Sequence, residues 1–543
     1  MSRSEKILIA VAAGLILFSL FSGMGSHDLR GEEPRRAVVS MEMVLSGRYV
    51  VPHVNGWPYY NKPPLFNWVV ALMYNVFGSF DEWVSRLPSL VALFLTAMLN
   101  YFVAGKYLGK KTALLGSLFF ITSADIFFYG SSNAGELDFF YALLVYVQVI
   151  SIIHFYIRKK FGRLYLVSYG FMALGVLCKG LPSLAFQGLT LLGLFIYDKN
   201  PKTIFNRHHV AGILLFVAMT GIYLVLYSRH GPVTGLLARQ FVESYDRSFV
   251  KMDLLHNILE FLSYPLLLIQ FLLPWSALII FLFNKNIKHE LSNNLFLTLS
   301  VIFILFNIPV YWLSNYHKAR YIYVFVPFIM NVLAWKYLSV SAEKNRPYRI
   351  FNMIILISII LSVIAIASLP FIDAIRKIHG IYYLLALLLA GCIFTGWLYF
   401  TRPSMRIIAL LLLLGILRIG ENEIYFPYLN AKDESYSWHH HANRILSITG
   451  DHPVFLAGKP YDLIETHRMK AFHFSDSAVV TPPLVPYELV YYVVKGNHKI
   501  MQYRLHPEAG KYYISDRNFA ERKNILYEFE DKNGNEKLCL FKE

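Results

Sequence analysis

The sequence predicts a mostly α-helical protein that crosses a membrane about thirteen times and ends in a small water-soluble α/β domain. Three observations predict this class. The 543 residues are 56% hydrophobic and only 16% charged, the mean hydropathy is +0.45, and apolar windows of bilayer length recur through the first 420 residues. A soluble fold of this size would not bury so much apolar surface, so lipid is the expected solvent.

The apolar windows define the expected spans in chain order. The first, residues 7–22, follows Arg3 and Lys6 as a signal peptide would, but we find no convincing cleavage site and interpret it as an uncleaved span. The other windows are residues 87–105, 112–129, 137–157, 164–178, 183–197, 209–227, 263–283, 295–314, 320–338, 351–369, 381–400 and 407–420.

Basic residues cluster in alternate connections between these windows, for example at 106–111, 158–163 and 199–207. If the N-terminus is cytoplasmic, the clusters face the cytoplasm, as the positive-inside rule requires. The formal charge of +16 therefore needs no nucleic-acid partner. The outer side then receives a long first loop (23–86), a second loop (228–262) and everything after residue 420. We expect a multi-pass protein of the inner (plasma) membrane.

After residue 420 the composition becomes polar, and short apolar stretches alternate with helix-like segments. We expect two domains: a transmembrane domain, 1–420, and an extracytoplasmic α/β domain, 421–543. The second domain contains no glycine-rich phosphate loop or nucleophile elbow, so the sequence does not indicate soluble nucleotide chemistry. Its three consecutive histidines, 439–441, point in different directions on any regular element and do not predict a metal site.

Dense charge follows the first span directly. Glu32 and Glu33 are adjacent carboxylates, and the cations Arg30, Arg35 and Arg36 surround them. Such charge at a membrane surface fits either a functional site or an ordinary interfacial turn with solvated charges. Further along the loop, Lys62 lies among aromatic residues and prolines, where a fixed cation could hold a phosphate or simply anchor the segment by snorkelling.

Several charged residues fall at the expected outer ends of later spans. An ionised Asp138 near lipid is costly unless it is paired or faces a water-filled cavity, so it belongs either to an active site or to a structural ion pair with a cation such as Arg35. Three cations lie at outer helix ends, where the positive-inside rule predicts few basic residues: Lys179, Lys318 and Arg320. Their position suggests anion binding. In the second loop, charges such as Arg239, Glu243, Asp246, Arg247 and Lys251 could pair along a solvated helix face.

The first loop resembles that of the bacterial lipid A aminoarabinose transferases and of the wider protein O-mannosyltransferase-like superfamily of GT-C glycosyltransferases. The resemblance rests on residues 32–37, 40–43, 46–47, 51–56 and 61–63, in the order and spacing of that family's first periplasmic loop. It continues more weakly through 137–138, 178–182, 273–275 and 317–321, and covers about the first 340 residues. The thirteen-span topology and soluble tail are also similar to the family.

The resemblance implies a GT-C fold and a transferase that moves a sugar from a polyprenyl-phosphate donor lipid to an acceptor on the outer side of the membrane. It implies catalytic roles for Glu32, Glu33 and Asp138, and substrate binding by Arg35, Lys62, Lys179, Lys318, Arg320 and Tyr321. The family usually has Asp where this chain has Glu32. Some members have a metal-binding glutamate where this chain has Asn61, so no metal ligand is assigned, although a divalent metal stays possible.

Other function classes remain open from the residues. A transporter or flippase could recognise a lipid phosphate without breaking a bond, although the chain shows no convincing internal repeat. A non-catalytic scaffold of the cell envelope is the third hypothesis. Within the enzyme class, the sequence does not distinguish lipid A, another envelope glycan or a protein as the acceptor, because variable outer segments are expected to bind it.

Overall fold

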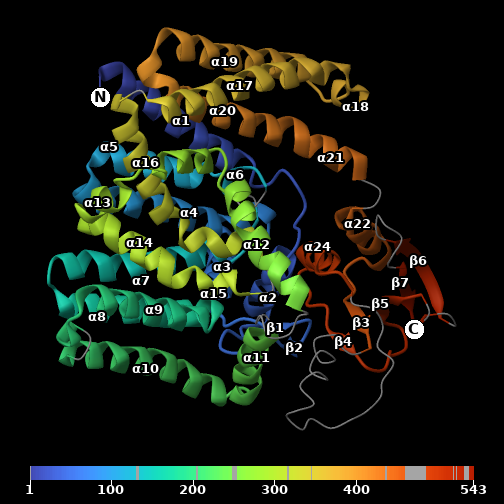
Figure 1. The fold of residues 1–543 in the computed structure, drawn as a ribbon. Coiled ribbons are helices and arrows are strands. Elements are labelled where there is room, and N and C mark those ends of the chain that lie inside the picture. Colours follow the sequence, from blue (N-terminus) through green and yellow to red (C-terminus); the bar gives the residue numbers. More distant parts are fainter. Residues whose placement is uncertain are drawn as a thin grey trace.

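The computed structural model describes residues 2–129, 134–203, 206–246, 254–314, 317–343, 345–433, 437–458, 485–517, 519–520, 523–530 and 537–543. A bundle of long helices makes up most of the molecule. A small five-stranded sheet with its own helices lies at one end of this bundle, and the N-terminus lies at the other end (Figure 1). This arrangement confirms the expected mostly helical membrane protein with a C-terminal α/β region.

Nine helical segments among the described residues are long and apolar enough to cross a membrane. They are α1 (Arg3–Ser22), α4 (Glu82–Leu108), α7 (Asp138–Ile157), α8 (Phe161–Lys179), α10 (Arg207–Ser228), α14 with α15 (Leu295–Asn307, Pro309–Trp312), α17 (Arg346–Ser368), α19 (Ile381–Thr401) and α20 (Arg406–Gly420). A tenth span exists if α12 (Leu254–Phe271) and η4 (Trp275–Leu282), which meet at 115°, count as one.

The expected count of thirteen spans is not confirmed, although each expected window falls on a helix. The helices α5 (Lys110–Ile121), α9 (Pro182–Asp198) and α16 (Val326–Glu343) do not meet the length and hydropathy of a span. After α5 the chain turns at Thr122 and Ser123, and a short helix, α6 (Ala124–Phe127), follows, so one apolar window covers two helices.

The first loop folds into two helices and a small hairpin. These are α2 (Glu33–Ser46), β1 (His53–Val54), β2 (Trp57–Pro58) and α3 (Leu65–Phe77). Gly31 turns the chain with φ of +64°, a conformation open to glycine, and Pro34 then lies in the first turn of α2. The first loop therefore has a regular folded structure between α1 and α4.

The second loop contains α11 (Val233–Asp246) and the first part of α12. Arg239 of α11 donates from Nε to the side-chain oxygen of Asn61 at 2.7 Å, so the two loops are in contact. The ion pairs expected of Glu243, Asp246, Arg247 and Lys251 involve side chains outside the described part of the chain. Shorter elements elsewhere are η2 (Pro201–Thr203), α13 (Ile287–Ser292), η5 (Ala319–Val324), η6 (Leu369–Phe371), α18 (Asp373–Arg376) and η7 (Pro403–Met405).

The C-terminal region continues directly from the last span. The helical segment runs on through the π-helical segment η8 (Glu421–Tyr425) into α21 (Phe426–Asp433), so the expected domain boundary at residue 420 falls within a continuous helical segment. Then come α22 (Trp438–Thr449), β3 (Val454–Ala457), α24 (Tyr487–Asn497), β4 (Tyr503–Arg504), β5 (Tyr512–Asp516), β6 (Asn524–Glu530) and β7 (Lys537–Lys542). The strand order is β4-β3-β5-β7-β6, in which β3 runs parallel to β4 and β5 while β7 is antiparallel to β5 and β6.

Helix α24 docks this region on the first loop and the start of α4. The hydroxyl of Tyr491, which is fully buried, donates to the backbone carbonyl of Phe80. Lys495 lies 2.8 Å from the carboxylate of Glu82. The loop is thus held between the helical bundle and the C-terminal region.

Candidate active site

An ion-pair network joins three elements that are distant in sequence. Asp138 begins α7 and Lys179 ends α8, and their side chains meet at 2.5 Å. Arg320 of η5 lies 3.6 Å from Asp138 and 2.5 Å from Glu136. All four side chains are less than one-fifth exposed. The chain therefore places two carboxylates and two cations together at the end of the bundle that carries the first loop.

Glu32 lies at the first-loop side of this network. It precedes α2, its carboxylate pairs with Arg35, and Arg36 is 4.0 Å away. Burial acts to raise the pKa of Glu32, but the positive charges of Arg35 and Arg36 outweigh it and lower the pKa to about 2. The side chain is still 37% exposed. Glu32 is therefore an ionised carboxylate that solvent or a ligand can reach.

The pKa of Glu136 shifts in the opposite direction from that of Glu32. Burial raises its pKa, and the negative charge of Asp138 adds to the effect despite the pairing with Arg320. The charges of Glu32 and Arg320 also act on one another, as do those of Arg36 and Asp138, which places the first-loop residues and the network in one electrostatic site. The site holds the three carboxylates Glu32, Glu136 and Asp138 among the four cations Arg35, Arg36, Lys179 and Arg320.

Tyrosine rings hold several of these cations. Lys179 Nζ lies 4.7 Å from the centre of the Tyr321 ring and 5.0 Å from that of Tyr141. Arg36 donates to the hydroxyl of Tyr59 at 2.7 Å. The guanidinium of Arg35 lies 5.9 Å from the ring of Tyr487, which belongs to α24 of the C-terminal region. Aromatic faces attract cations without neutralising them, so these contacts add to the ion pairs with Asp138 and Glu32 and do not cancel positive charge themselves.

Glu33 has different surroundings from its neighbour Glu32. Its side chain is 0% exposed and forms a two-pronged ion pair with the equally buried Arg86, at 2.6 and 3.1 Å. It also accepts from the backbone N–H of Gly135 at 2.8 Å. These contacts tie α2, α4 and the segment before α7 together. The catalytic role of Glu33 stays a prediction, and its enclosure favours a structural one.

Two predicted cations lie at the edges of the network. Lys62 is buried, and its charge acts on Cys178, the neighbour of Lys179. Lys318 is half-buried and directly precedes η5, two residues before Arg320. Asp138 does not pair with Arg35, the partner named as an example from the sequence, because Arg35 is occupied by Glu32.

Possible metal ligands can be compared only within the part of the chain that the structure describes. Among the described residues, no group of three or more His, Cys, Asp or Glu side chains is placed to hold an ion. Asn61, which stands where some aminoarabinose transferases have a metal ligand, accepts a hydrogen bond from Arg239. His439 stacks on Tyr492 and His441 bonds to the hydroxyl of Tyr527 at 2.9 Å, so these two side chains have separate partners.

Sequence reasoning missed several residues of the site. Glu136 had a local signal, because it lies two residues before Asp138 in a segment expected at an outer helix end. Arg36 lies inside the first-loop motif 32–37, and Tyr59 lies between the motifs 51–56 and 61–63, but neither was given a role. Tyr487 had no signal, since only the docking of α24 brings it to Arg35.

Known proteins are similar to this chain in sequence and in fold. Residues 61–227 match the family described as dolichyl-phosphate-mannose-protein mannosyltransferase. An uncharacterized protein of Aquifex aeolicus is 27% identical over 58% of this chain and 62% of its own length. The undecaprenyl phosphate-alpha-4-amino-4-deoxy-L-arabinose arabinosyl transferase of Edwardsiella ictaluri is 26% identical over 46% of this chain and 44% of its own length. The matched part is thus about half of each curated relative.

The structural likeness extends over nearly the whole chain. The crystal structure of ArnT from Cupriavidus metallidurans, determined with bound undecaprenyl phosphate, superposes with a TM-score of 0.69 at 15% identity. The superposition covers 98% of this chain and 97% of that one, including the C-terminal region. The chain is therefore a multi-spanning membrane protein with the GT-C glycosyltransferase fold, similar to the aminoarabinose transferases.

Proposed function

We propose that the chain is a glycosyltransferase that moves a sugar from a polyprenyl-phosphate donor to an acceptor on the outer side of the membrane. The observation that carries the proposal is the cluster of Asp138, Lys179 and Arg320, with the accessible carboxylate of Glu32 beside it, where the first loop meets the bundle. A lipid-phosphate leaving group departs as an anion and needs fixed cations, while an acceptor hydroxyl needs a carboxylate. The cluster supplies both.

Lys179 and Arg320 are the proposed phosphate ligands, with Lys62 and Lys318 at the edge of their site. Asp138 holds both cations in place, since it pairs with Lys179 at 2.5 Å and with Arg320 at 3.6 Å. Charges fixed before the donor arrives need no reorganisation when negative charge develops on the leaving phosphate. Asp138 is thus proposed as a positioning residue for the anion site.

Glu32 is the proposed carboxylate for the acceptor. With Arg35 and Arg36 beside it, the pKa of about 2 makes Glu32 a weak base that orients a hydroxyl by accepting its hydrogen bond. A donor phosphate that drew Arg35 or Arg36 away would remove part of this stabilisation and raise the pKa. Donor binding would then prepare Glu32 to take the acceptor proton.

The orientation of the chain and the choice of substrates belong to the same proposal. Basic connections at 106–111 and 158–163 support a cytoplasmic N-terminus, which places the candidate site and the C-terminal region on the outer side. Relatives named for arabinosyl transfer from undecaprenyl phosphate support a polyprenyl-phosphate donor, and lipid A, another envelope glycan and a protein are the acceptor classes to be tested. The contact between Tyr487 and Arg35 supports a role for α24 in binding the acceptor.

The test is transfer from a panel of radiolabelled polyprenyl-phosphate sugars into isolated membrane acceptors by the purified protein. Wild type is expected to transfer label from one donor, and Glu32→Gln to be slower by at least about 100-fold. The matched control is Glu528→Gln, which removes an exposed glutamate paired with Arg517 far along the chain. Donor binding without transfer by wild type, with every acceptor class present, would favour the flippase hypothesis.

A further inference from the structure

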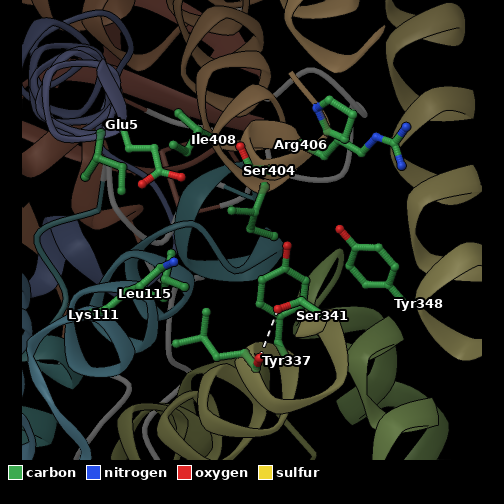
Figure 2. Close-up of a pocket in the computed structure, with 13 residues that line it drawn as sticks. Glu5, Lys111, Leu115, Tyr337, Ser341, Tyr348, Ser404, Arg406 and Ile408 are labelled. Carbon is green, nitrogen blue, oxygen red and sulfur yellow. Dashed lines mark hydrogen bonds between the residues drawn. The ribbon is translucent and has the colours of Figure 1, made fainter. Parts of the chain in front are cut away.

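A pocket of about 410 Å³ lies at the opposite end of the bundle from the candidate active site. Helix α4 shows the separation: it starts at Glu82, beside the C-terminal region, and its 27 residues extend about 40 Å before Lys111 follows in α5. We call this cavity the distal pocket. Its walls come from the ends of α1, α5, α16, α17 and α20, which are brought together only by the tertiary fold (Figure 2).

The electrostatics of the distal pocket favour an anion. Lys111 and Arg406 line it, and neither is paired with a carboxylate in the part of the chain that the structure describes. Arg406 stacks on Tyr399 at 4.5 Å, which fixes the guanidinium without cancelling its charge. The carboxylate of Glu5 also lines the pocket, but it already accepts from the N–H of Ser2 at 2.8 Å in the capping box of α1.

Helix ends add to the positive potential. Glu5, Lys111, Tyr348 and Arg406 each lie in the first turn of their helix, so four helix N-termini converge on the pocket. Side chains of Ser2 and Asn345 cap α1 and α17, whereas α5 and α20 have no side-chain cap among the described residues. Uncapped N-terminal amides bind anions, and here each uncapped helix also carries one of the two cations.

Hydroxyl donors complete the polar part of the pocket. Tyr337 and Tyr348 direct their hydroxyls toward the space between Glu5 and Arg406 (Figure 2). Tyr337 is buried to 5% exposure, so its hydroxyl is held in the wall. Cations and hydroxyl donors together suit a phosphate ester.

The remaining walls are apolar, and this identifies the source of the phosphate. Ile9, Leu115 and Ile407 line the pocket below its polar groups. Apolar walls next to a phosphate-binding group fit the start of the acyl chains of a lipid. A free phosphate would gain nothing from these walls.

We infer that the distal pocket binds the headgroup of an anionic phospholipid from the leaflet opposite the candidate active site. The phosphate lies between Lys111 and Arg406, and the acyl chains start against Ile9, Leu115 and Ile407. Basic pockets between membrane helices recognise anionic headgroups in this way. The inference does not depend on the proposed transfer reaction, because its evidence and its test involve only the opposite end of the molecule.

The test measures lipid binding by native mass spectrometry and thermal unfolding of the whole protein. The variants are Lys111→Ala/Arg406→Ala and the charge-keeping Lys111→Arg/Arg406→Lys, and the matched control is Lys110→Ala/Arg402→Ala, which removes two neighbouring cations that do not line the pocket. The ligands are nanodiscs of phosphatidylglycerol, nanodiscs of phosphatidylethanolamine, and inorganic phosphate alone.

Wild type, the control and the charge-keeping variant are expected to retain phosphatidylglycerol over phosphatidylethanolamine. The double alanine variant should bind it about 30-fold more weakly, since each cation near an anionic lipid contributes about 1 kcal/mol. Equal retention of both lipids by wild type would overturn the inference. So would an undiminished affinity in a folded double alanine variant, or equal stabilisation by inorganic phosphate alone, which would indicate a free-anion site.

Discussion

Asp138 and Lys179 are 41 residues apart in the chain, and their side chains meet at 2.5 Å where α7 begins and α8 ends. Arg320 joins them from η5. A buried ion pair is weak evidence for stability, because desolvation offsets most of the attraction between the charges. Its value here is to hold two cations in a fixed arrangement next to Glu32. The pair therefore suggests separate experiments on stability and on transfer.

Changing Lys179 to Ala should destabilise the protein and stop transfer. Loss of one partner leaves the buried carboxylate of Asp138 with Arg320 alone, and breaking such a pair costs about 3 to 5 kcal/mol. The double variant Asp138→Asn/Lys179→Gln removes both charges and should recover most of the melting temperature while transfer stays below about 1%. Transfer at the wild-type rate by the folded double variant would remove this pair from the site.

Changing Glu33 to Gln should lower stability more than it lowers the rate of transfer per folded molecule. The charge of Arg86 would lose its buried partner, at a cost of about 3 kcal/mol or more. Melting temperature in detergent and kcat normalised to folded protein separate the two effects. A variant that melts like wild type but does not transfer sugar would show instead that Glu33 is catalytic.

Stability should fall as the pH rises from about 4.5 to about 7 because of Glu42. Burial raises the pKa of this carboxyl to about 7 in the folded protein, although the backbone N–H groups of Asn55 and Gly56 oppose the shift. The folded state therefore holds the proton more tightly than the unfolded chain. The stability that results is complete below pH 4.5 and is lost as the pH passes through 7, by about 3 kcal/mol in all.

The Glu42 prediction is checked by thermal unfolding between pH 4 and pH 8. Glu42→Gln stays neutral at every pH and keeps an oxygen that can accept from Gly56, so its unfolding should lose this part of the pH dependence. Glu528→Gln, on an exposed surface pair, should keep it. The same slope in wild type and Glu42→Gln would contradict the assignment.

Tyr487 should affect substrate binding through Arg35 without affecting the docking of α24. Tyr487→Phe keeps a ring 5.9 Å from the guanidinium and should behave as wild type, whereas Tyr487→Ala should raise KM by about two- to fivefold, which corresponds to about 0.5 to 1 kcal/mol. Steady-state kinetics across donor and acceptor concentrations measure this. A loss of melting temperature with unchanged KM would show a packing role only.

Part of the fold and site could be predicted locally. Glu32, Arg35 and Arg36 share one helix start, so their proximity follows from spacing of three and four residues. The partner of Asp138 could not be predicted, because Lys179 and Arg320 reach it from other elements. Part of the excess in the span count arises because a hydropathy window does not show that the helix breaks between Ile121, where α5 ends, and Ala124, where α6 begins.

By itself the sequence determined the solvent of this protein and the chemistry available to it. Long apolar windows required a lipid environment, and in lipid the backbone N–H and C=O groups must pair with one another, which requires helices. Charges concentrated at the outer ends of these helices implied anion binding. Only the tertiary structure decided which charges act together. It enclosed Glu33 with Arg86 and left Glu32 accessible, although the two are adjacent, because successive side chains at a helix start point in different directions.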